Sequence, residues 1–363
     1  MLRKFRQKIK AYNQHRKDSR YWHEKIASLL TGRENMPDDY AQEIKDFYKQ
    51  YGLKVSNAWH KRYLDVLHMR DVRFIPEDLF YVDIEPRLNN LIYIDGIDDK
   101  NMYDLLFKAD GVSLPETVVR NINGHWLDGN YKLLDLAAAI KLCLSEEKLI
   151  IKKAVNSGGG KNIRVLREDE ITSENLQTTF SQLGENLVIQ KLLEQHKLLN
   201  EINPSSVNTI RIITIILHNE VLVVQSILRM GVGTSYVDNI CAGGMAVGIT
   251  AKGTLKEYAY DAQTKKQPKH LTTGFLFKDI SIPYYQNVES IAKDMHKRFA
   301  QFRLISWDFA IADKGPVLIE FNLKYQGMDH FQMFNEGPFF GELTDEVLTE
   351  LFGKKNNQRG YNE

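Results

Sequence analysis

The stretch "SWDFAIADKGPVLIEFN", residues 306–322, decides the fold. Two β-patterned runs flank Asp313–Gly315, a segment of good turn formers, so the stretch predicts a β-hairpin. If the loop has three residues, counting outward in antiparallel register brings Asp308 opposite Glu320. The question raised by this hairpin is why two acids and an amide interrupt otherwise apolar strands.

Side chains alternate between the faces of a strand, so one face of this hairpin is polar and the other apolar. The polar face carries Asp308, Glu320 and Asn322, and the apolar face carries Trp307, Phe309, Val317, Ile319 and Phe321. Two carboxylates directly across a ladder repel unless one is protonated or a cation lies between them. With the amide oxygen of Asn322 they form an all-oxygen set, which suits Mg²⁺ or Mn²⁺ better than zinc. The alternatives are a polar strand end facing solvent, and a glycosidase acid pair, which leaves Asn322 without a role.

A glycine-rich stretch lies upstream, in "KLIIKKAVNSGGGKNIRVL", residues 148–166. A strand, a triple-glycine loop and a second alternating strand predict a hairpin, whereas a Walker-type loop would open a helix. The backbone N–H groups of such a loop can close over a polyphosphate, although a plain turn has the same composition. Because side chains alternate, only one of Lys152 and Lys153 can reach the concave face of the loop.

Two further stretches add candidate binding residues. "LVIQKLLEQH", residues 187–196, is typical of a buried strand that runs into a hinge whose backbone could bind a purine edge. "VNTIRIITIILHNEVLVVQSILRMG", residues 207–231, predicts a second hairpin, and a three-residue loop puts Arg229 opposite Thr209 and diagonal to Arg211. Two guanidiniums in an apolar sheet need an anion, either a ligand or a nearby acid.

The chain as a whole is typical of a mixed α and β protein with a helical front. It has 363 residues, 43% of them hydrophobic, and a net charge of +1, so no global field favours nucleic acid. Its two cysteines are too few for a disulfide framework, and no run reaches the roughly 20 apolar residues of a membrane-spanning helix. We expect a helical section over 1–94 that ends in a strand at Leu91–Ile94, a body over 95–350, and a mobile polar tail over 351–363.

Residues 1–20 are strongly basic, with eight Lys or Arg side chains against Asp18. Apolar residues recur at helical spacing from Leu2 to Tyr12, which suits a helix lying on an anionic membrane surface. A solvated helix or a frayed arm fits the same pattern. We therefore expect a cytoplasmic protein, either without membrane contact or peripheral at the inner membrane surface through this arm.

In their order along the chain, these stretches resemble the ATP-grasp family over roughly residues 95–350. The resemblance implies an α+β ATP-grasp fold, in which two lobes grip ATP, with a small lid lobe at about 146–192. It also implies ATP and Mg²⁺ (or Mn²⁺) as cofactors. "IDDKNMYDLLF" resembles the segment of the first nucleotide lysine, "LIIKKAVNSGGGKNI" the second lysine and lid, and "VIQKLLEQH" the hinge. The residues implied are Lys100, Lys153, Gly158, Gly159, Gly160, Lys191, Leu193, Glu194 and His196 for the nucleotide, and Asp308, Glu320 and Asn322 for the metal.

Finer features, "NPSSVNTIRI", "VDNICAGG" and "NLKYQGMDHFQ", resemble the sugar-transfer-associated branch of the family and imply a role near cell-surface glycan assembly. The expected reaction joins a carboxylate to an amine or similar acceptor, either of which can be sugar-linked, through an acyl phosphate, with release of ADP and phosphate. Arg229 and Arg211 would stabilise the γ-phosphoryl group and the tetrahedral intermediate. The alternatives are a phosphotransferase on the same fold and a non-catalytic ATP-binding scaffold at the membrane.

Overall fold

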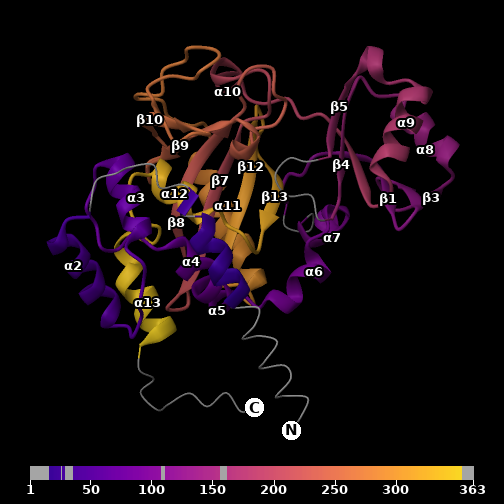
Figure 1. Cartoon of the computed structure of the whole chain (residues 1–363). Helices are drawn as coiled ribbons and strands as arrows, with labels where there is room; N and C mark the ends of the chain where they lie inside the picture. Colours follow the sequence, from indigo (N-terminus) through magenta and orange to yellow (C-terminus); the bar gives the residue numbers. More distant parts are fainter. Residues whose placement is uncertain (1–15, 26, 29–35, 108–110, 156–161, 354–363) are drawn as a thin grey trace, which may run out of the picture.

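The computed structural model describes residues 16–25, 27–28, 36–107, 111–155 and 162–353. Within these ranges the chain forms two antiparallel sheets and a layer of helices from its N-terminal part (Figure 1). The larger sheet stands at the centre, and the smaller sheet forms a lobe beside it. The predicted α+β class, with two lobes and helices in front, is confirmed.

The large sheet has the strand order β11-β10-β9-β8-β7-β12-β13. Its strands are β7 (Thr209–Leu217), β8 (Glu220–Met230), β9 (Met245–Ile249), β10 (Leu255–Asp261), β11 (Lys266–Gln267), β12 (Leu304–Ala312) and β13 (Gly315–Asn322). The central strands are rich in Ile and Val, which pack well on a pleated surface. On β7, Ile210 and Ile212 point into one hydrophobic core, whereas Ile213 and Ile215 point into another. Both faces of this sheet are therefore covered.

Helices from the two ends of the chain cover one face of the large sheet. They are α2 (Asp38–Lys49), α3 (Ala58–Leu67), α4 (Glu77–Leu79), a π-helix (Phe80–Ile84), α5 (Glu85–Leu88), α12 (Met328–Phe334) and α13 (Thr344–Phe352). In α2, the fully buried Tyr40, Ile44 and Tyr48 are spaced four residues apart and form the apolar stripe of an amphipathic helix. These helices share one core with β7, so the N-terminal section packs into the body of the protein.

The opposite face of the large sheet packs against α11 (Tyr285–His296), with α6 (Ile94–Ile97) and α7 (Tyr103–Phe107) beside it. Trp307 and Phe309 of β12 point into this core. Because side chains alternate along a strand, Asp308 between them points to the face that carries the N-terminal helices. The pocket described below lies on the part of that face around Asp308.

The small lobe is a six-stranded sheet of order β3-β2-β1-β6-β4-β5, backed by two helices. Its elements are β1 (Thr117–Ile122), β2 (His125–Asp128), β3 (Leu133–Leu134), α8 (Leu136–Cys143), β4 (Lys148–Lys153), β5 (Ile163–Arg167), α9 (Ser173–Leu183) and β6 (Leu187–Lys191). Leu149 and Ile151 of β4 pack against the helices, so Lys152 points to the other face. The sheet uses residues from Thr117 to Lys191, a longer stretch than the predicted lid lobe at about 146–192.

One smaller expectation is corrected. The strand predicted at Leu91–Ile94 is a 3₁₀-helix over Leu91–Tyr93 that continues into α6. An apolar run of four residues fits either structure, and hydrogen bonds to neighbouring carbonyls decide it here. Of the mobile tail predicted over 351–363, Leu351 and Phe352 belong to the end of α13, and residues 354–363 lie outside the described residues.

Of the basic arm predicted over 1–20, residues 1–15 lie outside the described residues. Residues 16–25 are helical, and Trp22 stacks on Tyr81 of the π-helix with ring centroids 4.5 Å apart. This helix is thereby attached to the body of the protein. In the ranges that the structure describes, every helix is too short or too polar to cross a membrane.

Candidate active site

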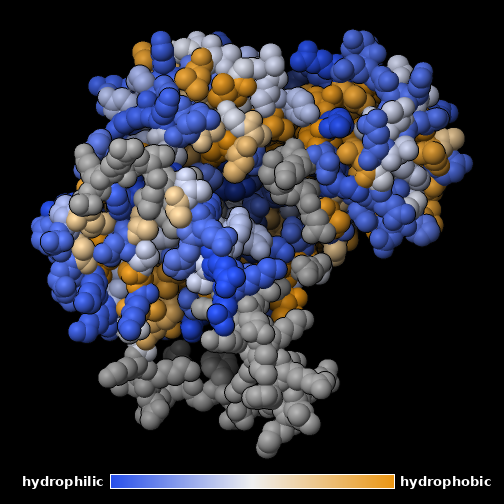
Figure 2. All heavy atoms as spheres, viewed as in Figure 1, coloured by the Kyte–Doolittle hydropathy of each residue, from blue (hydrophilic) through white to orange (hydrophobic). Residues whose placement is uncertain are grey.

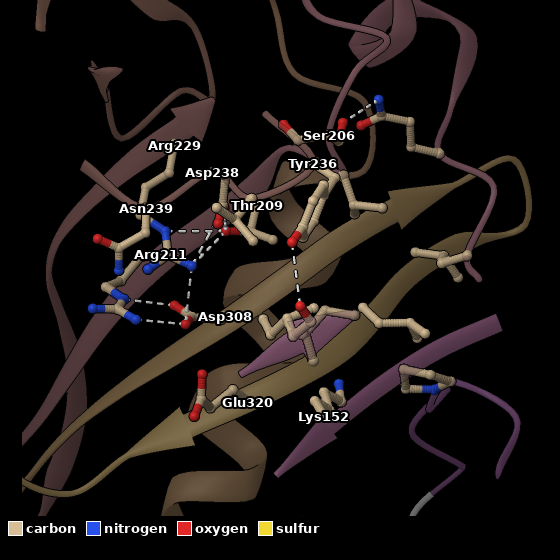
Figure 3. Close-up of a pocket in the computed structure, with 18 of the residues that line it drawn as sticks. Lys152, Ser206, Thr209, Arg211, Arg229, Tyr236, Asp238, Asn239, Asp308 and Glu320 are labelled. Atoms are coloured by element: carbon tan, nitrogen blue, oxygen red, sulfur yellow. Dashed lines mark hydrogen bonds and ion pairs between the residues drawn. The ribbon is translucent and has the colours of Figure 1, made fainter. Parts of the chain in front are cut away.

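A pocket of about 1150 Å³ lies between the two sheets. Its walls come from β7, β8, β12 and β13 of the large sheet, from β4 and β5 of the small lobe, and from the segment 190–195 (Figure 3). Hydrophilic residues cover most of the visible face of both lobes around it (Figure 2). Small-molecule sites commonly have roughly 300–1,000 Å³, so this pocket has room for more than one ligand.

The hairpin β12–β13 brings Asp308 and Glu320 opposite each other, as predicted, but the length of its turn and its register differ from the prediction. Its turn has two residues instead of three, because Ala312 pairs directly with Gly315. A β-bulge at Ile319 then shifts the register by one residue, so Asp308 does lie opposite Glu320. The bulge also turns Ile319 toward the pocket, so its predicted place on the apolar face was wrong.

The hairpin β7–β8 likewise has a shorter turn than predicted and a bulge that offsets it. Leu217 pairs with Glu220, which again leaves a two-residue turn in place of a three-residue loop. A bulge at Val224 shifts the register, and Arg229 lies opposite Thr209 as predicted. Both hairpins therefore deliver their charged residues to the same face of the sheet.

Asp308 is the centre of a buried ionic cluster (Figure 3). Arg211, directly opposite on β7, donates from Nε and Nη2 to the two carboxylate oxygens, each at 2.6 Å. Arg229 donates from Nη2 to Asp308 Oδ2 at 3.1 Å. Asp308 is 1% exposed, and burial alone would raise its pKa, but the two guanidiniums outweigh burial and hold the pKa below its usual range. In this structure Asp308 is the anion that the two arginines need.

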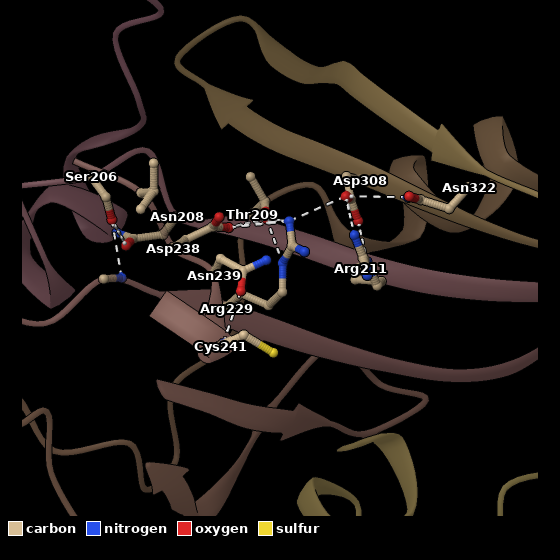
Figure 4. Close-up of polar contacts among 12 residues, drawn as sticks. Ser206, Asn208, Thr209, Arg211, Arg229, Asp238, Asn239, Cys241, Asp308 and Asn322 are labelled. Carbon is tan, nitrogen blue, oxygen red and sulfur yellow. Dashed lines mark hydrogen bonds and ion pairs between the residues drawn. The ribbon is translucent and has the colours of Figure 1, made fainter. Parts of the chain in front are cut away.

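The cluster continues into the loop between β8 and β9 (Figure 4). Thr209 accepts from Arg229 and donates from Oγ1 to Asp238, whose Oδ2 lies 3.4 Å from Arg229 Nη2. In the sequence, Asp238 stands in a glycine-marked turn that is equally typical of a plain β-turn. Its role as a second partner of Arg229 becomes visible only with the fold.

Glu320 and Asn322 lie beside Asp308 on the pocket face of β13. Glu320 Oε1 pairs with Lys100 Nζ at 2.5 Å, and Asn322 Nδ2 lies 3.5 Å from Asp308 Oδ2. Two carboxylates and an amide carbonyl are the donors that Mg²⁺ prefers. Among the described residues, no three His, Cys, Asp or Glu side chains gather to hold a metal, so a metal site here depends on Asn322 as well. The donor set fits a hard divalent ion, provided that Glu320 exchanges its contact with Lys100, that Asp308 shares an oxygen that now accepts from an arginine, and that Asn322 turns its amide oxygen toward the ion.

Lys148 and Lys152 of β4 both line the pocket, and the buried one is Lys152. It is 7% exposed and has no hydrogen-bond or ion-pair partner among the described residues. Burial and the nearby Lys100 lower the pKa of Lys152 to about 8, against the opposing effect of Glu320. Lys153 donates to the carbonyl of Glu185 at 2.6 Å and does not line the pocket. The placement of Lys153 at the nucleotide site is thereby corrected, because the helices that back β4 decide which of its faces is free.

The segment after β6 lines the pocket where the hinge was expected. Lys191, Leu193 and Glu194 all lie in the pocket wall. His196 does not: its ring Nδ1 accepts from Leu198 N and caps α10 (Lys197–Ile202). Three of the four predicted hinge residues are therefore placed at the pocket. The predicted lid residues Gly158, Gly159 and Gly160 lie outside the described residues.

Tyr236 is a pocket residue that the sequence did not single out. Its hydroxyl donates to the carbonyl of Ile163 at 3.2 Å, so it joins the loop after β8 to β5 of the small lobe (Figure 3). The two positions are 73 residues apart, and the contact depends on how the lobes face each other. No local sequence pattern reports such a contact.

One family of known proteins matches this chain over most of its length. A family model described as sugar-transfer associated ATP-grasp matches residues 80–346. A search of curated proteins found no match. Among solved structures, the ATP-grasp ligase PsnB, complexed with a phosphomimetic precursor variant, Mg and ADP, shares 14% identity over 70% of this chain and 59% of its own, with a TM-score of 0.41.

Two other solved structures are similar in the same range. D-cycloserine synthetase DcsG shares 13% identity over 69% of this chain and 70% of its own, with a TM-score of 0.42. D-alanyl-alanine synthetase A from Vibrio cholerae O1 biovar eltor shares 10% identity over 71% and 65%, with a TM-score of 0.41. The family match spans most of the chain and includes the hairpins that carry Asp308, Glu320 and Arg229, so the chain belongs to the sugar-transfer associated ATP-grasp family.

Proposed function

We propose that the protein is an ATP-dependent, ADP-forming ligase that joins a carboxylate to an amine or similar acceptor through an acyl phosphate. The observation that carries the proposal is a pocket in which buried cations from both lobes face the carboxylates of one hairpin. Lys152 comes from the small lobe, and Arg211 and Arg229 come from the large sheet. A polyphosphate is a ligand that supplies several negative charges to such a set.

ATP would supply the counter-charge that Lys152 has not found within the described residues. Lys152 and Lys100 would hold the phosphates, and the backbone of the hinge around Leu193 would hold the base. Asp308, Glu320 and Asn322 would hold Mg²⁺. When bound there, the ion would neutralise charge on the β- and γ-phosphates during transfer.

In the proposed reaction, a carboxylate oxygen of the substrate attacks the γ-phosphorus and ADP leaves. The amine then attacks the carbonyl carbon of the acyl phosphate, inorganic phosphate leaves, and the proton lost by the amine nitrogen goes to the departing phosphate. Asp308 fixes Arg211 and Arg229 in place, so these guanidiniums need no reorganisation when negative charge builds up beside them. The contact from Tyr236 to Ile163 holds β5 over the pocket and helps to exclude water, which would hydrolyse an acyl phosphate.

The sugar-transfer association of the family favours a substrate from cell-surface polysaccharide assembly. We therefore propose that the acid or the acceptor is sugar-linked. Peripheral membrane contact through the basic arm is part of the same proposal. It predicts that the full-length protein binds anionic vesicles at physiological salt and that a version lacking residues 1–15 does not; equal binding by the two would refute the contact.

The reaction class is tested by trapping. Purified protein is incubated with Mg²⁺, ATP, hydroxylamine and a panel of carboxylates that includes uronic acids, amino acids and peptides. A ligase yields ADP together with an acyl hydroxamate, and Glu320→Gln lowers both by at least about 100-fold, as expected when a contact made in the transition state is lost. Glu257→Gln, which changes an exposed carboxylate on β10, serves as the matched control. ADP release with a stable phosphorylated product and no hydroxamate would identify a phosphotransferase instead.

A further inference from the structure

The turn that follows β13 forms the end of the pocket opposite the hinge. Residues 323–327 line the pocket directly after Asn322. The hinge lies near the other end of the hairpin, because His196 N donates to the carbonyl of Ile311, which pairs with Pro316. At about 3.3 Å per residue along a strand, the hinge and the turn are roughly 20 Å apart, with Glu320 between them. A nucleotide that reaches from the hinge to Glu320 leaves the turn for the other substrate.

This turn has a backbone conformation that needs outside support. Tyr325 has a φ of 56°, and its side chain is 68% exposed, with its ring centroid 6.2 Å from that of Tyr81. A bulky residue with positive φ is strained, and such strain persists only where surrounding contacts determine the conformation. Gly327, with a φ of 78°, completes the turn at the start of α12.

Two residues of the N-terminal section supply that support. Tyr81 Oη accepts from the backbone N–H groups of Gly327 and Met328 at 3.1 and 3.3 Å. Glu85, which is 3% exposed, accepts from Gln326 N at 3.3 Å. Burial raises the pKa of Glu85 to about 7, and the backbone N–H groups of the turn oppose this rise. Consecutive amides of the turn are therefore tied to one short segment of the N-terminal section.

The support extends further back into the N-terminal section. Trp22 stacks on the ring of Tyr81 with an angle of 15° between the rings. Lys25 of the same helix pairs with the buried Glu77 at 2.5 Å, three residues before the π-helix begins. The helix over residues 16–25 thus packs against Tyr81 and pairs with Glu77 near it. Tyr81→Phe would keep the stack on Trp22 and lose the hydroxyl, so the contribution of the hydroxyl can be measured apart from that of the stacked ring.

We propose that Tyr81 and Glu85 are positioning residues, which hold residues 324–327 as the pocket wall that contacts the second substrate. Tyr325, at the apex of the turn, then helps to determine which carboxylate is accepted. The identity of the two ligands rests on the proposed function, whereas the support of the turn does not. The N-terminal section thereby acquires a role in the site and is more than a cover for the sheet.

Amide hydrogen exchange on the full-length protein tests the positioning. In Tyr81→Phe, exchange at Gly327 and Met328 should become about 2–10-fold faster, the effect of losing one hydrogen bond each. Glu85→Ala should do the same at Gln326, and Glu85→Gln, which keeps an acceptor oxygen, should do so less. Tyr21→Phe, at an exposed ring of the same helix as Trp22, is the control and should change nothing. Unchanged exchange in both Tyr81→Phe and Glu85→Ala would overturn the proposal.

Addition of AMPPNP and Mg²⁺ tests which substrate the turn serves. Amides of residues 191–195 should be protected, those of residues 325–328 should not, and the affinity of Tyr81→Phe for AMPPNP should stay within about twofold of wild type. Protection of the turn by the nucleotide would overturn its assignment to the second substrate. Lack of protection anywhere would refute the proposed function together with that assignment, while the exchange rates of the variants would still decide whether Tyr81 and Glu85 hold the turn.

Discussion

The two lobes present their charges to the pocket in different ways. On the large sheet, Asp308 has Arg211 and Arg229 as partners, and Glu320 has Lys100. On the small sheet, Lys152 is buried without a hydrogen-bond or ion-pair partner among the described residues. Charges held by protein neighbours are preorganised, whereas a buried charge without a partner is costly until a ligand supplies the opposite charge. The large sheet therefore holds its charged side chains in place before a ligand binds. On the small lobe, the charge of Lys152 is stabilised most when an anionic ligand binds.

The largest effect should come from breaking the partnered cluster. In Asp308→Ala, Arg211 and Arg229 remain buried without their common anion, so the free energy of unfolding should fall by about 3–5 kcal/mol. Chemical denaturation at pH 7 measures the change. Glu257→Gln, at an exposed site, should stay within about 0.5 kcal/mol of wild type. A loss below about 1 kcal/mol for Asp308→Ala would mean that the two arginines do not depend on this carboxylate.

Removal of the buried charge of Lys152 should have the opposite effect on the free energy of unfolding. Lys152→Met should leave the free energy of unfolding unchanged or raise it, because a buried ammonium is replaced by an apolar chain of similar length. Its affinity for AMPPNP and Mg²⁺ should fall by about 10–100-fold, the value of a hydrogen bond to a charged group. Lys153→Met, one residue along the strand, is the matched control and should change affinity by less than about twofold. Calorimetric titration of the two variants decides between the lysines, and the reverse result would restore Lys153.

The same lysine should give nucleotide binding a characteristic pH dependence. The pKa of Lys152 is lowered to about 8, with Lys100 and Glu320 as its charged neighbours, so the free protein loses this proton as pH rises through about 8. The affinity for AMPPNP should then fall above pH 8, by at most about tenfold per pH unit. Between about 8 and 10.5 the unfolded chain binds more protons at this site than the folded protein, so stability attributable to Lys152 rises with pH. Lys152→Arg keeps its charge and should show a flatter affinity profile; identical profiles would contradict the assignment.

The smallest effect should come from the contact that joins the lobes. Tyr236→Phe removes the hydrogen bond to the carbonyl of Ile163, which is worth about 0.5–1.5 kcal/mol. Dissociation of a fluorescent ATP analogue, followed by stopped flow, should become about 2–10-fold faster. Tyr93→Phe, at an exposed ring outside the pocket, should have no effect. An unchanged dissociation rate in Tyr236→Phe would show that the two lobes are held together by other contacts.

Much of the fold and the charged row of the site could be predicted from the sequence, because both depend on the period-two alternation of strands. Asp308, Glu320 and Asn322 lie on one face, and Arg229 lies opposite Thr209, as the pattern predicts. Turn length was predicted less well. In the β7–β8 turn, His218 and Asn219 have φ values of 48° and 65°, as a tight two-residue hairpin turn requires, and neither is a glycine that would have signalled it.

The choice between Lys152 and Lys153 shows where sequence reasoning ends. Alternation says that the two side chains point to opposite faces, but α8 and α9 decide which face is buried, and these helices pack by tertiary contacts. The hydrogen bond from Gly327 N to Tyr81 Oη is of the same kind, since the two residues are 246 positions apart in the sequence. Local patterns predict which residues share a face, whereas the choice of the free face depends on the whole fold.

In both hairpins a bulge lies between the turn and the residue pair that carries charge. In a regular ladder the length of the turn would fix which residues lie opposite each other, and the bulge removes this dependence. A change of one residue in the turn can be absorbed by gain or loss of the bulge, so the carboxylate of Asp308 keeps its place beside that of Glu320. Homologous chains are then free to differ by one residue in the interval between these acids and still build the same ionic row. The turns of these two hairpins can therefore change in length during evolution while the charged residues farther along the strands keep their positions.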